Sequence, residues 1–173
     1  MAIDFRLTAR QRELQLRSRK FAREVLSPAI EAETLPIPEA RFAATKSAYE
    51  AMIAAGLLRQ CIPQSAGGEN VGLIDTAIMV EELYAVNASV TLTLIGTVLG
   101  LLPLLIGGTK EQRGRLLPPF LKQAGAPLAG FCATEAAPVG EAVTELSGSL
   151  TVRHLGPSSS HPLVISGAVA LRM

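Results

Sequence analysis

The N-terminal quarter of the chain carries apolar residues with the period of an α-helix. They recur at spacings of seven and four and are separated by charged residues, at Leu7, Leu14, Phe21 and Val25. This pattern predicts an amphipathic helix with one apolar stripe. Thr8 and Gln11 have the spacing of a capping box, which opens the helix. Pro28 disfavours helical backbone at the residue before it, so we expect the helix to end near Leu26.

A second helix is predicted between Leu35 and Gly56. Pro38 suits a first helical turn, and Gly56 suits the position after a last turn. Its buried face is expected to hold four large residues, Phe42, Tyr49, Met52 and Ile53. The connection that follows is broken by Pro63 and by the flexible pair Gly67-Gly68.

A third helix is predicted from Leu73 to Val86, where apolar and acidic residues lie one turn apart. Ile74, Ala77 and Ile78 supply its apolar positions. Glu81 and Glu82 are interpreted as charges that face solvent or pair with another helix, rather than as a catalytic carboxylate pair.

The next segment is uncharged from Leu83 to Thr109 and would be ~40 Å long as a helix, enough to cross a bilayer. Gly96-x-x-x-Gly100 has the spacing that lets membrane helices pack closely, but the same spacing also serves a tight crossing in a soluble bundle. Polar residues occupy its first half, at Asn87, Ser89, Thr91, Thr93 and Thr97. Since the neighbouring helices have polar faces, we favour a soluble bundle whose central helix, from Ser89 to Ile106, is buried on all sides.

Thr109 and Gln112 form another capping box, which starts a short helix that Pro118-Pro119 is expected to close. After Gly125 the pattern changes to short runs of β-branched residues between Gly, Ser and Pro. Three strands are therefore expected, in "PLAGFCATE", "GSLTVRHL" and "PLVISGAVAL". The fold class is mainly α: an up-and-down helical bundle over 1–125, then an incomplete β segment over 126–173.

Composition removes several classes of function. Nearly half of the residues are hydrophobic and only 4% are aromatic, and 16 basic residues balance 15 acidic ones. This balance gives no support for a nucleic-acid partner, which should contact a basic stripe. Cys61 and Cys132 match no metal or disulfide framework, so no metal is expected and reduced thiols in the cytoplasm are the simplest interpretation. The first residues lack the apolar run of a secretory signal.

Four segments, in this order, resemble the acyl-CoA dehydrogenase family. "AGLLRQCIPQSAGGENVGL" resembles that family's Gly-Leu, Ile-Pro and Gly-Gly connection, and "MVEEL" is similar to the helix after it. "LGLLPLLIGGTKEQRGRLLPPFL" resembles the family's buried helix, its turn and a helix that ends in Leu-Pro, and "PLAGFCATE" resembles its flavin-side strand. The match extends from about Phe5 to Glu135 and favours a domain core over a membrane span for the uncharged helix.

The resemblance implies a helical domain, a middle β-domain and a C-terminal helical domain, usually in a homotetramer that binds FAD. Such enzymes take a proton and a hydride from an acyl-CoA thioester. Phe131, Ala133 and Thr134 match the flavin-side strand, although a solvated strand end is the alternative for Thr134. Three further residues, Leu92, Ile95 and Leu99, fall where the family lines its acyl slot, and ordinary core packing is their alternative.

The sequence departs from the family after Glu135. The family continues with Pro and a Gly-rich turn, but here the text is "AAPVGEAV", with Val139 at a glycine position. A side chain there should obstruct close approach of the backbone. The domain that supplies the catalytic carboxylate lies beyond these residues, so no catalytic residue is assigned and we expect the chain not to catalyse alone. A non-catalytic subunit that assembles with a full-length relative, as a homo- or hetero-oligomer, is the alternative, followed by a small membrane protein.

Overall fold

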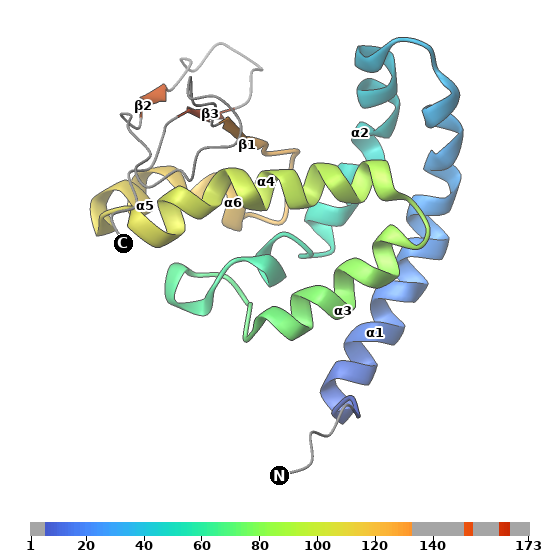
Figure 1. Ribbon diagram of the computed structural model, residues 1–173, viewed down its shortest axis with the longest axis horizontal. Coiled ribbons are helices and arrows are strands. Elements are labelled where there is room, and N and C mark those ends of the chain that lie inside the picture. The colour runs from blue at the N-terminus through green and yellow to red at the C-terminus, as the bar shows by residue number, and fades with distance from the viewer. Residues whose placement is uncertain (1–5, 133–150, 154–162, 167–173) are drawn as a thin grey trace, which may run out of the picture. The chain divides into compact units, whose positions relative to one another are not determined.

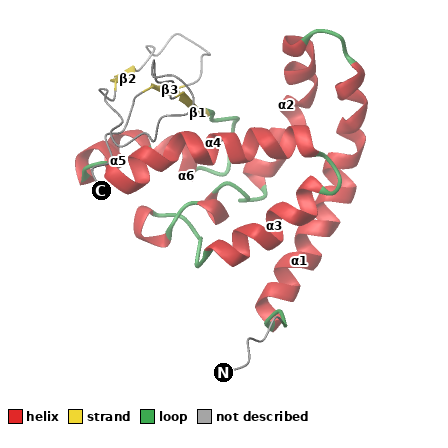
Figure 2. Cartoon of the chain, viewed as in Figure 1, coloured by secondary structure: helices red, strands yellow, loops and turns green. Residues whose placement is uncertain are grey.

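The computed structural model describes residues 6–132, 151–153 and 163–166 (Figure 1). Most of the described residues are helical, as the red ribbons of Figure 2 show. The chain forms two compact units. The first contains the residues up to Leu94 together with Phe120–Ala126, and the second contains Ile95–Pro119 and the described residues from Pro127 onwards. The prediction of a mainly α fold is confirmed, whereas the boundary after residue 125 stays a prediction.

The helices in chain order are α1 (Ala9–Phe21), the π-helical turn η1 (Ala22–Leu26), the 3₁₀-helix η2 (Ser27–Thr34), α2 (Pro38–Ala54), the 3₁₀ turns η3 (Arg59–Cys61) and η4 (Gln64–Ala66), α3 (Leu73–Tyr84), α4 (Ala88–Gly107), α5 (Lys110–Leu116) and α6 (Pro118–Leu121). Both predicted capping boxes are present. The Thr8 hydroxyl accepts the Gln11 N–H at 3.2 Å, and the Thr109 hydroxyl accepts the Gln112 N–H at 3.1 Å. The sequence therefore located both helix starts correctly.

The α-helical part of the first helix ends at Phe21 and its π-helical continuation ends at Leu26, the predicted end, but the chain does not leave the helical path there. The backbone widens into the π turn η1 and then tightens into η2, which carries the helical path to Thr34. A π turn changes the hydrogen-bond register of the backbone. Pro28 then lies in the first turn of η2, where its missing N–H has no intrahelical partner to lose.

Two ion pairs join α1 to α3 within the first unit. The guanidinium of Arg10 lies 2.5 Å from the carboxylate of Asp75, and that of Arg19 lies 2.6 Å from the carboxylate of Glu82. Both carboxylate side chains are only 10% exposed. Glu82 is thus a helix-pairing charge, as the sequence suggested. Hydrogen bonds from Arg10 and from Arg19 hold the pKa of Asp75 and of Glu82, respectively, below the usual values, against the opposing effect of burial.

These lowered pKa values predict that acid destabilises the protein. A carboxyl group whose pKa is lower in the folded state stabilises the fold above its unfolded pKa, near 4.3 for Glu, and loses this contribution as the pH falls through the folded pKa. Urea titrations should therefore give a lower free energy of unfolding at acid pH than at pH 7. This difference between the two pH values should be smaller in Glu82→Gln than in the unchanged protein. Glu50→Gln is the control, because Glu50 and Lys46 form an exposed pair at 3.8 Å. An unchanged loss in Glu82→Gln would contradict this assignment.

Ser18 is a polar residue buried in α1. It is 1% exposed, and its hydroxyl has no hydrogen-bond partner among the described residues. An unsatisfied buried hydroxyl costs about 1–3 kcal/mol, so Ser18→Ala is expected to raise the free energy of unfolding by about 1 kcal/mol. Ser47→Ala, at an exposed position of α2, measures the change in helix propensity alone. Equal gains in the two variants would show that the Ser18 hydroxyl carries no penalty.

The core of the first unit lies mainly between α2, α3 and the segment that joins them. Its fully buried large side chains include Leu26, Tyr49, Met52, Ile53, Leu58, Ile62, Met79 and Leu83. Phe42 is 45% exposed and Ile74 is 66% exposed, so the predicted buried faces of α2 and α3 are too long. Both residues lie near the N-terminal end of their helix. The helical spacing of apolar residues extends to that end, although no other described element covers the helix there.

Asn87 sets the start of α4. Its side-chain oxygen accepts the Val90 N–H at 3.0 Å, and its amide nitrogen donates to the Leu26 carbonyl at 3.4 Å. Asn87 is 2% exposed, so both groups are satisfied inside the protein. The side chain is therefore the N-cap of α4 and also binds it to the end of η1.

The second unit contains a three-stranded sheet in the order β1-β3-β2. The strands are β1 (Ala129–Cys132), β2 (Thr151–Arg153) and β3 (Leu163–Ser166), each within a segment where a strand was predicted. β1 pairs with β3 in parallel and β2 pairs with β3 antiparallel.

Pro118 opens the short helix α6 rather than only closing α5, because proline suits a first helical turn.

Candidate functional site

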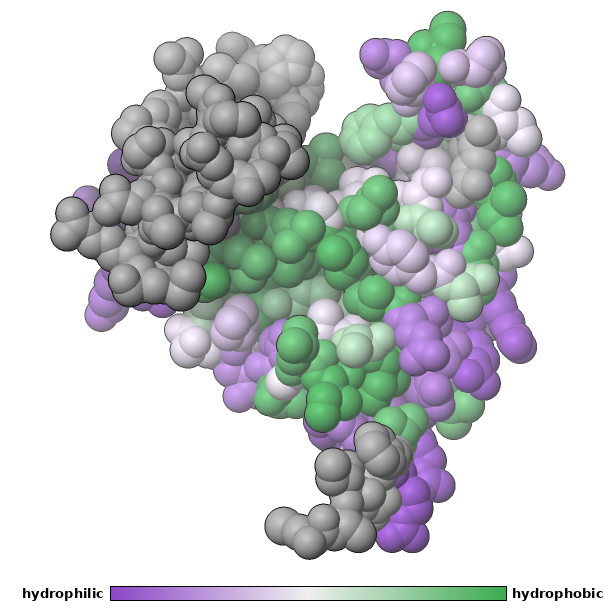
Figure 3. All heavy atoms as spheres, in the orientation of Figure 1, coloured by the Kyte–Doolittle hydropathy of each residue, from purple (hydrophilic) through white to green (hydrophobic). Residues whose placement is uncertain are grey.

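One face of α4 is apolar and exposed. Its residues are three or four positions apart along the helix: Leu92, Ile95, Leu99, Leu102 and Ile106. Leu92 is 58% exposed, Leu99 49% and Ile106 81%. Figure 3 shows apolar side chains gathered along α4. We call these five residues the α4 stripe, and it extends for about 21 Å along the helix.

The α4 stripe corrects the prediction that this helix is buried on all sides. Seven other residues of α4 are buried, namely Val90, Thr91, Leu94, Thr97, Gly100, Leu101 and Leu104. The helix is long and apolar enough to cross a membrane, and 39% of its most apolar window is buried inside the protein. The prediction assumed that a helix with apolar residues on every face is also buried on every face. In the structure, the described residues cover only one side of α4.

Gly100 is the point at which α4 touches β1. A Cβ atom added to Gly100 would lie 2.5 Å from the carbonyl carbon of Ala129 and 2.7 Å from the nitrogen of Gly130. Real side chains do not approach backbone so closely, so the helix and strand can meet here only through a glycine. Gly96 differs, because a Cβ atom there would meet nothing within 4 Å. The Gly96-x-x-x-Gly100 spacing thus includes one glycine required by a helix–strand contact and one on open surface.

Two of the predicted site residues are sequence neighbours of the α4–β1 junction. Leu99 precedes Gly100 on the helix, and Phe131 follows Gly130 on the strand, so each is one residue from the shared contact. Both are about half exposed. Leu92 lies two turns earlier, about 10 Å along the helix axis, and Ala133 and Thr134 lie outside the described residues.

The described end of β1 fits a flat ring system such as a flavin. Gly130 is exposed, and a Cβ atom at this position would meet nothing within 4 Å, so a ligand has free access to the backbone there. Phe131 adds an exposed aromatic side chain next to it. Backbone access beside apolar side chains is the usual composition of a cofactor site. The described part of the strand thus leaves room for a flat ligand beside its backbone.

Other residues capable of catalysis do not form a site in the described part of the chain. Burial raises the pKa of the Cys61 thiol to about 12, so this cysteine is neutral and unreactive at neutral pH. Asp75 and Glu82 are held in ion pairs. Among the described residues, no three His, Cys, Asp or Glu side chains group closely enough to hold a metal ion.

Gly100, Leu102 and Ile106 belong to the site but were not assigned to it from the sequence. The signal for the two large residues was present, because they continue the spacing of Leu92, Ile95 and Leu99. The importance of Gly100 had no comparable signal. A glycine in a helix has many causes, and only the position of β1 distinguishes Gly100 from Gly96.

The described residues thus form a helical domain joined to a strand that exposes backbone and an aromatic side chain. The model of the acyl-CoA dehydrogenase N-terminal domain matches residues 8–124. The chain belongs to the acyl-CoA dehydrogenase family.

Three relatives illustrate the match. The chain is 37% identical over 145 residues to a nitroalkane oxidase of Podospora anserina, a match that covers 83% of this chain and 34% of the relative. It is 38% identical over 82 residues to a cyclohex-1-ene-1-carbonyl-CoA dehydrogenase of Geobacter metallireducens, covering 47% and 21%. A solved nitroalkane oxidase mutant crystallized with 1-nitrohexane superposes with a TM-score of 0.73 at 32% identity, covering 78% of this chain and 31% of that one. The chain spans at most about a third of the length of these relatives.

Proposed function

We propose that this chain forms the helical wall of an active site in which FAD oxidises a substrate with an alkyl chain. The observation that carries the proposal is the α4–β1 junction, where an exposed apolar stripe meets an accessible strand. The stripe would bind the alkyl chain, and β1 would contact the flavin. Each buried methylene group stabilises binding by about 0.8 kcal/mol, so a stripe of five large apolar residues favours a long chain over a short one.

We favour a nitroalkane as the substrate over an acyl-CoA thioester. Relatives named nitroalkane oxidases are 32–37% identical over 77–83% of the chain. A relative named as a probable medium-chain acyl-CoA dehydrogenase is 29% identical over 77% of the chain, and the cyclohexene-carbonyl-CoA dehydrogenase matches 47% of it. Nitro and thioester groups both acidify the neighbouring C–H bond, so both substrates suit proton removal by a base in a site that excludes water. The bound flavin accepts the electrons of the substrate. The contribution of this chain is to bind the alkyl part, orient it and exclude water.

The test uses the complete reading frame that contains these residues, with residues 1–173 expressed in parallel. The purified product should bind FAD, and 1-nitrohexane should bleach the flavin absorption band under anaerobic conditions faster than hexanoyl-CoA does. These two compounds carry the same six-carbon chain, so the comparison isolates the activating group. Faster bleaching by hexanoyl-CoA would overturn the choice of substrate, and no bleaching by either compound would overturn the proposed function.

We expect residues 1–173 to be inactive alone. The chain spans at most about a third of its matched relatives, and its described residues supply a wall without a base positioned for proton removal. Turnover by residues 1–173 with added FAD would contradict this expectation. Acyl-CoA dehydrogenation stays the second choice of reaction.

A second candidate function is that of a non-catalytic subunit in a homo- or hetero-oligomer with a full-length relative. It is favoured by the sheet, in which β1 and β2 are the outer strands and each presents one edge without a partner among the described strands. Exposed strand edges pair readily with other chains. Co-expression with a full-length relative followed by size-exclusion chromatography tests this idea. A stable mixed complex supports it, and elution of the two chains as separate species contradicts it.

We also infer that α4 is a domain helix and that the protein is cytoplasmic, without a membrane or nucleic-acid partner. Thr91 and Thr97 are fully buried on α4, and Gly100 contacts a strand. In a bilayer-spanning helix, Thr91, Thr97 and Gly100 would contact lipid or another membrane helix. In this protein they are covered by other parts of the same chain. Extraction of cell membranes with alkaline carbonate should leave the protein in the soluble fraction, and recovery in the pellet would overturn the inference.

A further inference from the structure

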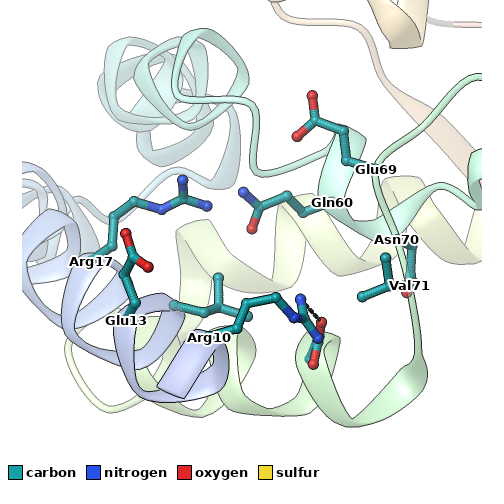
Figure 4. Close-up of a pocket in the computed structure, with 9 residues that line it drawn as sticks. Arg10, Glu13, Arg17, Gln60, Glu69, Asn70 and Val71 are labelled. Atoms are coloured by element: carbon teal, nitrogen blue, oxygen red, sulfur yellow. Dashed lines mark ion pairs between the residues drawn. The ribbon is translucent and has the colours of Figure 1, made fainter. Parts of the chain in front are cut away.

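A cavity lies in the first compact unit, and its lining residues are far from the α4 stripe in sequence. It has a volume of about 220 Å³ and is lined by residues of α1, of η3 and of the segment that leads into α3. Figure 4 shows it from the side, with Arg17 on α1 and Gln60 on η3 pointing toward one another across the opening. This volume is below the range of sites for drug-sized ligands, so a smaller molecule fits it better.

Most of the charged side chains around the cavity already have partners. Arg10 pairs with Asp75 at 2.5 Å, and Glu69 lies 3.3 Å from Arg59. Asn70 is fixed in the same way, because its amide nitrogen donates to the Thr76 hydroxyl at 3.0 Å. These interactions hold the edges of the cavity in place.

Three polar side chains of the lining remain without a partner among the described residues. They are Glu13 and Arg17, which lie one turn apart on α1, and Gln60. The structure contains no ion pair within 4 Å between Glu13 and Arg17, although their spacing permits one. The unused groups are therefore one anion, one cation and one neutral amide, and they surround a space that also touches Leu14 and Val71.

We propose that this cavity binds a small aliphatic α-amino acid as its zwitterion. The carboxylate would accept hydrogen bonds from the Arg17 guanidinium and the Gln60 amide, and the ammonium group would donate to the Glu13 carboxylate. Leu14 and Val71 would contact the aliphatic side chain. A simple anion or a simple cation would satisfy one of the two charges and leave the other beside it unpaired, so the site should discriminate against both.

The test is an NMR titration of the ¹⁵N-labelled full chain with L-valine, 3-methylbutanoate and isobutylamine. The last two are valine without its amino group and without its carboxylate. L-valine should produce saturable shifts, including those of the Gln60 side-chain amide, and should bind about tenfold more tightly than either fragment, the ratio expected when about 1.4 kcal/mol of interaction is lost. Binding should also raise the melting temperature of the protein.

Variants distinguish the cavity from general attraction to a charged helix. Arg17→Met and Glu13→Gln should each weaken L-valine binding by about three- to fivefold, because both residues are exposed and exposed ion pairs contribute up to about 1 kcal/mol. Arg12→Met is the matched control, since Arg12 is an exposed cation of α1 outside the cavity lining, and it should bind as the unchanged protein does. Gln60→Ala provides a third, independent variant.

Four outcomes would overturn the proposal. Equal binding of 3-methylbutanoate and L-valine would make the cavity an ordinary anion site, and equal binding of isobutylamine would make it a cation site. The absence of saturable shifts with L-valine, or equal weakening in Arg12→Met and Arg17→Met, would remove the site altogether. None of these results depends on flavin or on the reaction proposed for the α4–β1 junction.

Discussion

Replacing Gly68 by alanine is expected to lower the free energy of unfolding by about 3 kcal/mol, at the upper end of the usual cost of overpacking. A Cβ atom at Gly68 would lie 1.9 Å from the carbonyl oxygen of Ile62 and 2.5 Å from its carbonyl carbon. The same oxygen accepts the Asn70 N–H at 3.0 Å, and Ile62 is fully buried. The connection between η3 and α3 therefore has to open or shift to admit one methyl group.

Gly72→Ala is the matched control for Gly68→Ala. Gly72 lies four residues later in the same connection, has an extended backbone, and would place its Cβ within 4 Å of nothing. Since Gly72 precedes α3 as its N-cap, a loss of about 1 kcal/mol is the most that this change should cause. Urea unfolding followed by circular dichroism measures both variants. Equal losses would contradict the steric explanation for Gly68.

Gly100→Ala and Gly96→Ala are expected to change stability in opposite directions. Alanine has a higher helix propensity than glycine by about 1 kcal/mol, so Gly96→Ala should stabilise the protein by about that amount. At Gly100 the added Cβ would lie 2.5 Å from the backbone of β1, and the net result should be a loss of about 2 kcal/mol.

Gly100→Ala should also move β1 away from α4. The backbone amide resonances of Gly130 and Phe131 should shift strongly in this variant and remain nearly unchanged in Gly96→Ala. If both variants stabilise the protein, the helix and the strand are not in contact at Gly100. Such a result would remove the junction on which the proposed function depends.

The helices could be predicted because their signals are local. Thr8 and Thr109 each lie three residues before a glutamine, and the backbone atoms that these side chains bind are in the same turn. Asn87 was missed as a cap because no glutamine or glutamate follows it at that spacing, and its second hydrogen bond goes to Leu26, 61 positions away. Local sequence patterns do not report such long-range partners.

Exposure was the property that sequence reasoning judged least well. Phe42, Ile74 and Leu92 are apolar residues at helical spacing, and all three are largely exposed. Periodicity identifies which face of a helix is apolar, but the element that covers that face comes from elsewhere in the fold. For α4 the uncovered face is the informative one, because it coincides with the residues that the resemblance assigned to a substrate slot.

The candidate site was predicted in part. Leu99 and Phe131 were assigned from the resemblance, and they are the sequence neighbours of Gly100 and Gly130, where α4 contacts β1. Family membership follows from the matched N-terminal domain, whereas the roles of these two residues stay predictions. The cavity between α1 and η3 had no sequence signal, because Glu13, Arg17 and Gln60 come from segments that are adjacent only after folding.

If the α4 stripe binds the alkyl chain of the substrate, as we propose, Leu99 should contribute to the preference of the complete protein for long chains over short ones. The ratio of kcat/KM for 1-nitrohexane to that for nitroethane should fall about tenfold in Leu99→Ala, because a pocket that loses methylene groups loses about 1–3 kcal/mol of discrimination. Leu16→Ala, at an exposed leucine of α1, should leave the ratio unchanged. A ratio that is the same in Leu99→Ala as in the unchanged protein would contradict the account.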